Sequence, residues 1–405
     1  MAGRLVIIGA GQGAFALAAK LRALKDDRPI TIIGSEEVLP YQRPPLSKKY
    51  LMGEMSFDRL EFRSSQWFLD NNVEIRLSTW VEEIDRKAKT VRMQDGSVLA
   101  YDKLALATGA APRLLPAGVG GDLDGVLTVR DKRDADRLRE EMQPGRRLLV
   151  IGGGYIGLEA AAVARQLGLD VTLIEMADRI LQRVASAETA AIMRDLHVSK
   201  GVSVRENTGL VRLEGEGGRV KKAELSDGSS LDVDFVIAGI GVTPNDRLAR
   251  ESGLAVGNGV IVDEFTRTSD FDIHAMGDCA VLPMNGAAVR LESVQNAVDQ
   301  AEAAALVLSG EERPYLPKPW FWSDQYDVKL QIAGFNAGYD ETVLRPGQRA
   351  GSHSIWYFKQ GRFVAVDAIN DAKAYVTGKK TLDTDFPLNR AILEDPAADL
   401  KSLLT

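Results

Sequence analysis

The stretch Gly9-Ala10-Gly11-Gln12-Gly13-Ala14 decides the fold of this chain, because it directly follows the apolar run Leu5-Val6-Ile7-Ile8. A second stretch, Gly152-Gly153-Gly154-Tyr155-Ile156-Gly157, directly follows Leu148-Leu149-Val150-Ile151. Each pattern predicts a strand, a tight glycine turn and a helix, which together point backbone N–H groups and a helix N-terminus at a pyrophosphate. Two such turns predict two bound dinucleotides, with electrons passing between them.

The acidic residue after the second turn indicates which nucleotide it binds. A helix is predicted over Leu158–Leu167 and a strand over Val171–Ile174, and this strand ends at Glu175, eighteen residues after Gly157. A carboxylate at this position is expected to bind the adenosine ribose hydroxyls and to repel a 2′-phosphate. The second turn is therefore predicted to prefer NAD over NADP.

An acidic residue also follows the first turn, but at a shifted position. A helix is predicted over Ala14–Leu24 and a strand over Ile30–Ile33, after which the acidic position reads Gly34-Ser35-Glu36. Because the carboxylate is shifted along the chain, either Ser35 or Glu36 is expected to contact the ribose.

The duplication extends beyond the glycine turns. The segments Lys103–Gly109 (KLALATG) and Phe235–Gly241 (FVIAGIG) are similar strands, and each is followed closely by a proline. A hairpin is predicted from strands at about 220–225 and 231–237. The last residues show strand-like runs at 355–358 and 362–366. The expected fold is α/β, with two Rossmann-like domains and a small C-terminal α+β domain.

Proline- and glycine-rich segments mark the joints between these domains. They lie at 113–125 and 314–319, and such segments favour loops over helices or strands. The predicted domains are a discontinuous first domain, a second Rossmann-like domain and a C-terminal domain, at 1–112 with 251–315, at 113–250 and at 316–405.

Composition excludes several functions. The 405 residues carry a net charge of −7, which argues against general nucleic-acid binding because that requires a basic face. No stretch approaches the length of a membrane span, and a strand begins at once with no signal-peptide pattern, so a cytoplasmic protein is expected. The single cysteine, Cys279, rules out an intramolecular disulfide. With only three histidines beside it, no protein-bound metal or iron–sulfur site is expected.

Three further segments give the chain a specific resemblance. They are Arg43-Pro44-Pro45-Leu46-Ser47-Lys48, Gly157-Leu158-Glu159 and Pro319-Trp320-Phe321-Trp322-Ser323-Asp324-Gln325-Tyr326. Together with the order of the two turns, the chain resembles the pyridine-nucleotide flavoprotein oxidoreductases over essentially its whole length. Within them it is similar to the NADH-dependent ferredoxin reductases of the putidaredoxin reductase type, which serve bacterial haem-thiolate monooxygenases and ring-hydroxylating dioxygenases.

The resemblance implies that the first turn binds FAD and the second binds NADH. The residues expected to contact FAD are Gly9, Gly11, Gly13, Ala14, Ser35, Glu36, Arg43, Lys48, Val81, Thr108, Gly109, Arg130, Asp278 and Val294. Those expected to contact NADH are Gly152, Gly154, Tyr155, Ile156, Gly157, Glu159, Glu175 and Gly241.

The resemblance also implies three catalytic residues. Lys48 and Glu159 are expected to form a pair beside flavin N5, where the lysine favours negative charge on the reduced ring and the carboxylate orients the lysine. Trp322 is expected to lie near the flavin and the nicotinamide, as a stacking and shielding ring. Tyr155, inside the second turn, is expected to gate the nicotinamide pocket.

The resemblance implies a small acidic 2Fe-2S ferredoxin as electron acceptor, and indirectly a monooxygenase or dioxygenase. Because this chain is also acidic, docking requires a local basic patch, for which the candidates are Arg290, Arg313, Lys318 and Lys329. A monomer or weak dimer is expected. Two alternatives share the cofactor motifs: an NADH-dependent flavoprotein that reduces a quinone or an ascorbyl radical, and an NAD-sensing flavoprotein.

Overall fold

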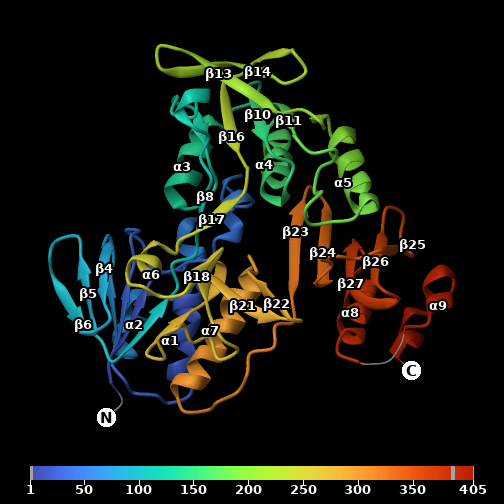
Figure 1. The fold of residues 1–405 in the computed structure, drawn as a ribbon. Coiled ribbons are helices and arrows are strands. Elements are labelled where there is room, and N and C mark those ends of the chain that lie inside the picture. The colour runs from blue at the N-terminus through green and yellow to red at the C-terminus, as the bar shows by residue number, and fades with distance from the viewer. Residues whose placement is uncertain (1–2, 385–387, 405) are drawn as a thin grey trace. The chain divides into compact units, whose positions relative to one another are not determined.

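The computed structural model describes residues 3–384 and 388–404, and the chain folds into two compact units (Figure 1). The first unit consists of three stretches of chain, Met1–Arg43, Ser56–Ala111 and Val242–Pro319. The second unit consists of Pro44–Met55, Pro112–Gly241 and Trp320–Thr405.

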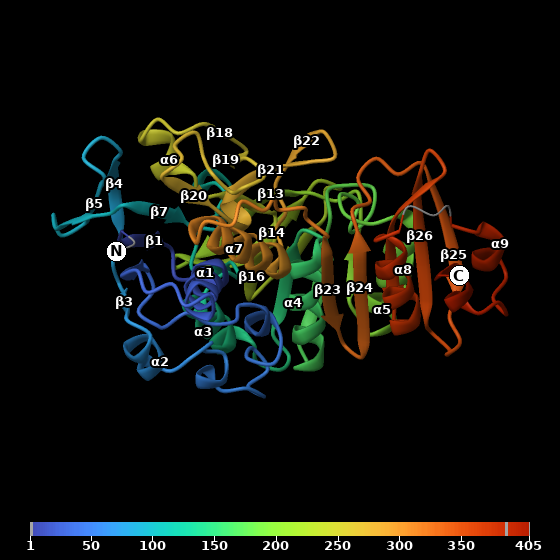
Figure 2. The ribbon, with the colours of Figure 1, turned by 90° about the horizontal axis from the view of Figure 1, so that it is seen from below.

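The first unit is centred on a five-stranded parallel sheet. Its order is β20-β7-β1-β2-β3, with bounds Ile273–Ala275, Lys103–Leu106, Leu5–Ile8, Ile30–Ile33 and Val73–Arg76. β1 and β2 are buried at every residue, as is typical of parallel strands covered on both faces. Helices α1 (Gln12–Ala23) and α7 (Val294–Leu308) lie side by side (Figure 2) and share one apolar core with these strands.

Smaller elements complete the first unit. They are the antiparallel sheet β4-β5-β6 (Val81–Asp85, Thr90–Met93, Val98–Ala100), the sheet β18-β19-β21-β22 (Val256–Gly257, Gly259–Ile261, Ala280–Met284, Ala287–Val289), the pair β8 and β17 (Ala110–Pro112, Val242–Pro244), and helices α2 (Ser65–Asp70) and α6 (Arg247–Glu251).

The second unit contains a second parallel sheet built like the first. Its order is β12-β11-β10-β16-β9, with bounds Ser203–Arg205, Asp170–Ile174, Arg147–Ile151, Phe235–Ala238 and Val126–Leu127. Helices α3 (Lys132–Glu141), α4 (Tyr155–Gln166) and α5 (Ala187–Ser199) contribute apolar side chains to a core shared with these strands. The prediction of two Rossmann-like domains is confirmed by this pair of sheets.

A three-stranded antiparallel sheet is attached to this half of the second unit. Its strands are β13 (Leu210–Glu216), β14 (Arg219–Leu225) and β15 (Ser230–Asp232). The single strand predicted at 231–237 is therefore wrong, because the chain leaves β15 after Asp232 and enters the parallel sheet as β16 at Phe235.

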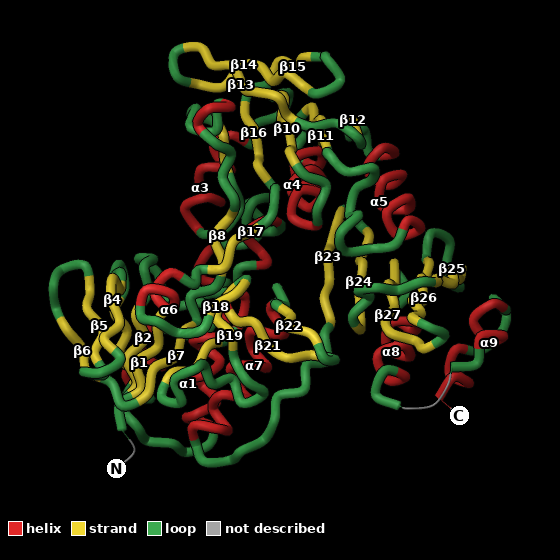
Figure 3. The backbone as a smooth tube through the Cα atoms, in the orientation of Figure 1, coloured by secondary structure: helices red, strands yellow, loops and turns green. Residues whose placement is uncertain are grey.

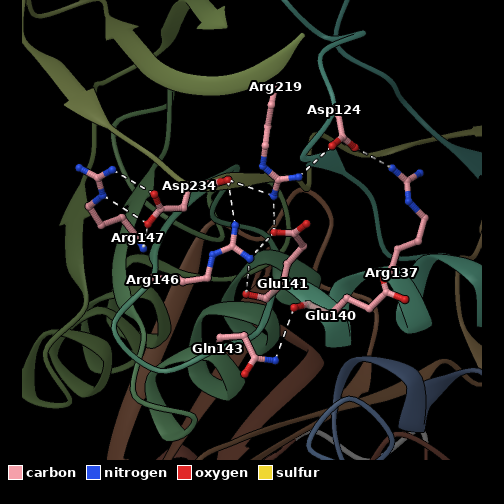
Figure 4. A network of polar contacts seen from close by, with 9 residues as sticks. All are labelled: Asp124, Arg137, Glu140, Glu141, Gln143, Arg146, Arg147, Arg219 and Asp234. Atoms are coloured by element: carbon pink, nitrogen blue, oxygen red, sulfur yellow. Dashed lines mark hydrogen bonds and ion pairs between the residues drawn. The ribbon is translucent and has the colours of Figure 1, made fainter. Parts of the chain in front are cut away.

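An ion-pair network holds this sheet to α3 (Figure 4). Arg219, at the start of β14, pairs with Asp124 at 2.8 Å and with Glu141 at 2.5 Å. Arg146 pairs with the same Glu141 carboxylate at 2.5 Å. The hydrogen bond to Glu141 raises the pKa of Arg219. A carboxylate shared by two guanidinium groups fixes both more firmly than an isolated surface pair does.

The second unit ends in an antiparallel sheet with helices beside it, shown by type of element in Figure 3. The strand order is β23-β24-β27-β26-β25, with bounds Trp320–Gln325, Val328–Gly334, Arg362–Ile369, His353–Lys359 and Glu341–Pro346. Helices α8 (Ala372–Thr381) and α9 (Arg390–Glu394) pack on it around the buried Trp356 and Phe358. This confirms the predicted small C-terminal α+β fold.

Within residues 3–384 and 388–404, no helix is long and apolar enough to cross a membrane. The same residues contain no group of three or more His, Cys, Asp or Glu side chains placed to hold a metal ion.

Candidate functional site

The first glycine turn has the geometry of a dinucleotide-binding turn. Gly9 has φ of +110°, and a Cβ there would lie 2.2 Å from the carbonyl oxygen of Ala107 on the neighbouring strand's end. A Cβ at Gly11 would meet no described atom within 4 Å. Gly11 is also the N-cap of α1 and, as glycine, offers no side-chain acceptor to the first N–H groups of the helix. Open space before unpaired helical N–H groups fits a phosphate.

Gly13 and Ala14 occupy the first turn of α1. Both are buried, and a Cβ at Gly13 would lie 3.3 Å from the carbonyl oxygen of Ala297 in α7. The small residues here therefore permit close packing of α1 against α7, whereas Gly11 keeps open the space before the helix.

The second turn repeats this arrangement in the second unit. Gly152 has φ of +104°, and a Cβ there would lie 2.5 Å from the carbonyl oxygen of Gly239. A Cβ at Gly154, the N-cap of α4, would meet no described atom within 4 Å. A Cβ at Gly157 would lie 2.1 Å from the carbonyl oxygen of Gly152. The three positions thus have the geometry expected for the tight turn, for the approach of a phosphate and for the packing of helix on strand.

Glu175 is fixed beside the second turn by two backbone bonds. Its Oε2 accepts a hydrogen bond from the Gly153 N–H, and its Oε1 accepts one from the Ala177 N–H, both at 2.8 Å. The carboxylate is therefore held at the end of β11 next to the glycine turn. This is the place where it can meet ribose hydroxyls and repel a phosphate.

Three large apolar side chains are exposed after the strands that carry this turn. Ile156 is 45% exposed, Met176 is 81% exposed and Ile240 is 37% exposed. They follow β10, β11 and β16, which are neighbours in the sheet. The sequence analysis names Ile156 as an expected NADH contact, whereas Met176 and Ile240, which directly follow Glu175 and Gly239, carry no such expectation. Gly241, another residue expected to contact NADH, follows Ile240 and has a φ of +96°.

Ser35 and Glu36, the two candidates for ribose binding in the first unit, lie in different environments. Ser35 is exposed, whereas the Glu36 carboxylate accepts a hydrogen bond from the Tyr41 hydroxyl at 2.7 Å and pairs with Arg43 at 2.5 Å. Arg43, expected from sequence near the cofactor, is therefore brought to Glu36. Which of Ser35 and Glu36 contacts a ribose stays a prediction.

The other residues expected to contact FAD in the first unit follow its parallel strands or lie beside them. Thr108 and Gly109 follow β7, and Thr108 Oγ1 donates to the Asn245 carbonyl oxygen at 2.7 Å. Asp278 follows β20, the neighbour of β7. Since Gly9 follows β1, also a neighbour of β7, four expected residues gather at one sheet edge, where α/β proteins bind ligands.

The remaining expected residues lie elsewhere. Val81 is a buried residue at the start of β4, and Val294 is the half-buried first residue of α7. Arg130 belongs to the second unit, and its backbone N–H donates to Asp134 at 3.0 Å just before α3. For these three, contact with a cofactor stays a prediction.

The predicted Lys48–Glu159 pair is present in the second unit. Lys48 Nζ lies 2.5 Å from Glu159 Oε2. Ser47 Oγ donates to the same oxygen at 2.8 Å, and Ser323 Oγ donates to Oε1 at 2.7 Å. The Glu159 side chain is 2% exposed and that of Lys48 is 18% exposed. A buried carboxylate requires such partners, because an unpaired charge away from water is very costly.

Sequence reasoning missed the two serines of this site. Ser47 precedes Lys48 in the 3₁₀ helix Pro44–Ser47, and Ser323 lies in β23. Both serines lie inside the motifs that indicated the family, so those motifs could have identified them.

The aromatic residues of β23 divide between the two faces of the strand. Trp322 stacks on Trp320, with ring centroids 5.6 Å apart. Phe321 contacts Tyr155, with ring centroids 4.8 Å apart. The Tyr155 hydroxyl is buried without a hydrogen-bond partner among the described residues, and burial raises the pKa of this phenol. The proposed roles of Trp322 and Tyr155 toward nicotinamide stay predictions.

Arg290, one of the four predicted docking residues, is little exposed. The Arg290 side chain is only 8% exposed, pairs with Glu292 at 2.8 Å and donates to the Asp278 carbonyl oxygen at 3.1 Å. Arg313, Lys318 and Lys329 are exposed.

Comparison with known proteins identifies the class. The family described as pyridine nucleotide-disulphide oxidoreductase matches residues 3–301, and the family described as reductase C-terminal matches residues 320–404. The chain belongs to the pyridine nucleotide-disulphide oxidoreductase family and, within it, to the ferredoxin reductases of the putidaredoxin reductase type, as the sequence predicted.

Individual relatives match over nearly the whole chain. Rhodocoxin reductase of Rhodococcus erythropolis is 42% identical over 399 residues, which cover 98% of this chain and 93% of that protein. Putidaredoxin reductase of Pseudomonas putida is 36% identical over 406 residues, which cover 99% and 96%. The solved structure of the covalent putidaredoxin reductase–putidaredoxin complex matches with a TM-score of 0.96, 36% identity, and coverage of 99% of this chain and 98% of that chain.

Proposed function

We propose that this protein carries electrons from NADH, through FAD, to a 2Fe-2S ferredoxin that supplies an oxygenase. The overall reaction converts NADH and two oxidised ferredoxins into NAD⁺, two reduced ferredoxins and one proton. The observation that carries the proposal is the occurrence of two open glycine turns together with one buried Lys48–Glu159 pair. When bound, FAD accepts two electrons as a hydride and releases them singly.

The domains divide this work. The discontinuous domain at 1–112 and 251–315 holds FAD, the domain at 113–250 holds NADH, and the domain at 316–405 contributes Ser323, which donates to Glu159. In the first domain the N–H groups after Gly11 bind a pyrophosphate, and in the second those after Gly154 do so.

The chain's own residues act mainly by position and charge. Lys48 places a cation where negative charge develops during hydride transfer, which lowers the barrier if the cation is held in advance. Glu159 holds Lys48 through the 2.5 Å contact and is itself held by Ser47 and Ser323. Trp322 shields the reacting rings from water.

Glu175 selects NADH. Its carboxylate is anchored by two backbone N–H groups and cannot turn away from a 2′-phosphate without leaving both bonds. The unfavourable approach of two negative charges discriminates against NADPH.

The partner binds by charge. Arg313 and Lys318 of the first unit and Lys329 of the second unit are exposed basic residues, and each is proposed to attract an acidic ferredoxin. The protein acts in the cytoplasm as a monomer or weak dimer.

The test compares acceptors. Purified protein with bound FAD is reduced by NADH and then mixed with a 2Fe-2S ferredoxin, a quinone or ascorbyl radical in separate assays. We expect rapid reduction of ferredoxin that weakens with salt, because screening shortens the range of charge attraction. Faster turnover with the quinone or the radical, or a persistent reduced state that no acceptor oxidises, would overturn the proposal in favour of a small-molecule reductase or an NAD sensor.

A further inference from the structure

A line of buried polar side chains leads from Glu159 through the second unit. Ser323 Oγ donates to Glu159 Oε1 at 2.7 Å, and Gln325 Nε2 donates to Ser323 Oγ at 3.0 Å. Gln325 Oε1 lies 2.7 Å from His197 Nε2, and His197 Nδ1 lies 3.4 Å from the Tyr326 hydroxyl. Ser323, Gln325 and His197 are each no more than 1% exposed. Three separate elements, α4, α5 and β23, contribute to this line.

The direction of every bond in this line follows from its first member. The Glu159 carboxylate is paired with Lys48 and can only accept, so the Ser323 hydroxyl gives its single proton to Oε1. The Ser323 oxygen must then accept from the amide nitrogen of Gln325, which turns Gln325 Oε1 toward His197. Since Oε1 is an acceptor, His197 Nε2 carries the ring proton. Burial lowers the pKa of His197, which favours this neutral ring.

The Glu159 carboxylate is held from two sides. Ser47 and Lys48 hold Oε2 from the 3₁₀ helix side, whereas Ser323 is the contact that holds Oε1 from β23. If the Ser323 hydroxyl turned elsewhere, the carboxylate could rotate and carry Lys48 with it. The amide of Gln325 prevents that turn, and the His197 N–H prevents the amide from flipping.

We propose that His197 and Gln325 are positioning residues for hydride transfer, acting through Ser323 on the Lys48–Glu159 pair. This inference rests on the proposed function, because the pair must lie at the reacting rings. His197 carries no motif in the sequence, and its separation from Gln325 is 128 residues. The line also explains why a histidine occupies a fully buried position on α5 where an apolar residue would pack as well.

Two substitutions at one position separate positioning from packing. In His197→Gln the amide nitrogen can reach the place of Nε2 and donate to Gln325. In His197→Asn the shorter amide reaches only the place of Nδ1. Both variants replace the ring by a smaller amide and differ in the reach of the donor. Asn also lacks one methylene of Gln, and the thermal unfolding midpoint reports that extra loss of packing. Tyr326→Phe is a further control, because Gln325 already fixes the His197 proton without the 3.4 Å contact.

The measurements are the limiting rate of flavin reduction by NADH, the Kd for NADH, the midpoint potential of bound FAD and the thermal unfolding midpoint. We expect His197→Asn to lower the limiting rate roughly three- to tenfold, since small misplacements of a catalytic group are costly. Its Kd for NADH should be unchanged, and its flavin potential should become more negative as Lys48 is held less well. His197→Gln and Tyr326→Phe should match the unmodified protein in rate and potential.

Equal rates in His197→Asn and the unmodified protein would overturn the inference, as would equal losses in His197→Asn and His197→Gln. If His197→Asn does not fold, Gln325→Met, which keeps volume but removes the donor, must show the same slowing and potential shift. These outcomes concern the NADH-to-flavin step, so they are distinct from failure of the proposed function, which would show in the unmodified protein as failure to reduce ferredoxin.

Discussion

Alanine in place of Gly154 should weaken NADH binding without unfolding the protein. Gly154 has φ of −78° and ψ of 176°, a conformation that alanine adopts without strain. The added methyl would meet no described atom within 4 Å. At such positions, replacing glycine by alanine changes the free energy of unfolding by only about 0.5 kcal/mol.

The expected loss of affinity follows from what the methyl group displaces. It would stand in the open space before the N–H groups that begin α4, where the pyrophosphate of NADH is proposed to bind. Losing one hydrogen bond between a charged phosphate and an N–H group costs about 1.5–3 kcal/mol. Since each 1.4 kcal/mol is about tenfold in affinity, the Kd for NADH should rise roughly 10- to 100-fold.

The assay is anaerobic flavin reduction at increasing NADH, which gives the Kd and the limiting rate separately. The limiting rate should change little, because the methyl group lies at the pyrophosphate and not at the nicotinamide. Gly11→Ala is the matched variant in the first unit, since its Cβ also meets no described atom within 4 Å. Gly11→Ala should lower the retention of FAD. After FAD is added back, this variant should keep the Kd for NADH of the unmodified protein.

Gly157→Ala is the contrasting control in the same turn. Its Cβ would lie 2.1 Å from the Gly152 carbonyl oxygen and 3.3 Å from a Val150 methyl group, so it should lower the thermal unfolding midpoint by several degrees. A Gly154→Ala protein that binds NADH with unchanged Kd would refute the reasoning, because the open space would then have no role in phosphate binding.

Three further predictions follow from particular side chains. Glu175→Ala should raise kcat/KM with NADPH relative to NADH by about tenfold or more, as removal of a repelling charge predicts; an unchanged ratio in steady-state assays would count against the assignment. Burial raises the pKa of Asp367 to about 6, so the folded state binds this proton more tightly than the unfolded chain and the contribution of Asp367 to stability falls as pH rises through 4 to 6. Asp367→Asn should therefore reduce the loss of unfolding free energy between pH 5 and pH 7 by roughly 1 kcal/mol in urea titrations, and identical pH dependence in both proteins would contradict this. Cys279→Ser should keep nearly full NADH-to-ferredoxin activity, because the Cys279 thiol is fully buried and donates to the backbone carbonyl oxygens of Met276 and Leu106, at 3.3 and 3.5 Å; a large loss with FAD still bound would show that the thiol takes part.

The local parts of this fold could be predicted because the chemistry that determines them is local. The predicted strand Leu5–Ile8 is β1, and the predicted strand Val171–Ile174 lies within β11, Asp170–Ile174. The helix predicted from Leu158 begins earlier, at Tyr155, since the extended Gly154 caps it and leaves the residues after the turn helical.

Contacts between distant segments could not be predicted in the same way. The strand predicted at 231–237 divides because Asp234 turns its side chain to the Arg147 backbone N–H at 2.8 Å, a partner that no spacing rule indicates. The segment Pro44–Met55 belongs to the second unit although its neighbours on both sides belong to the first. Neither composition nor periodicity indicates that a segment belongs to a different unit from its sequence neighbours.

The position of Pro44–Met55 in the second unit creates a buried ion pair that the stability of the fold does not require. It brings Lys48 and Ser47 to Glu159 across 111 and 112 residues of sequence, and β23 brings Ser323 across 164. Taking a lysine and a glutamate out of water costs more than burying apolar residues of similar size, so a buried ion pair is weak evidence of stabilisation. Three donors from two segments offset that cost only while the carboxylate keeps one orientation. The fold therefore holds the charge of Lys48 in place at a cost to its own stability, as the proposed hydride transfer beside Lys48 requires and a purely structural core does not.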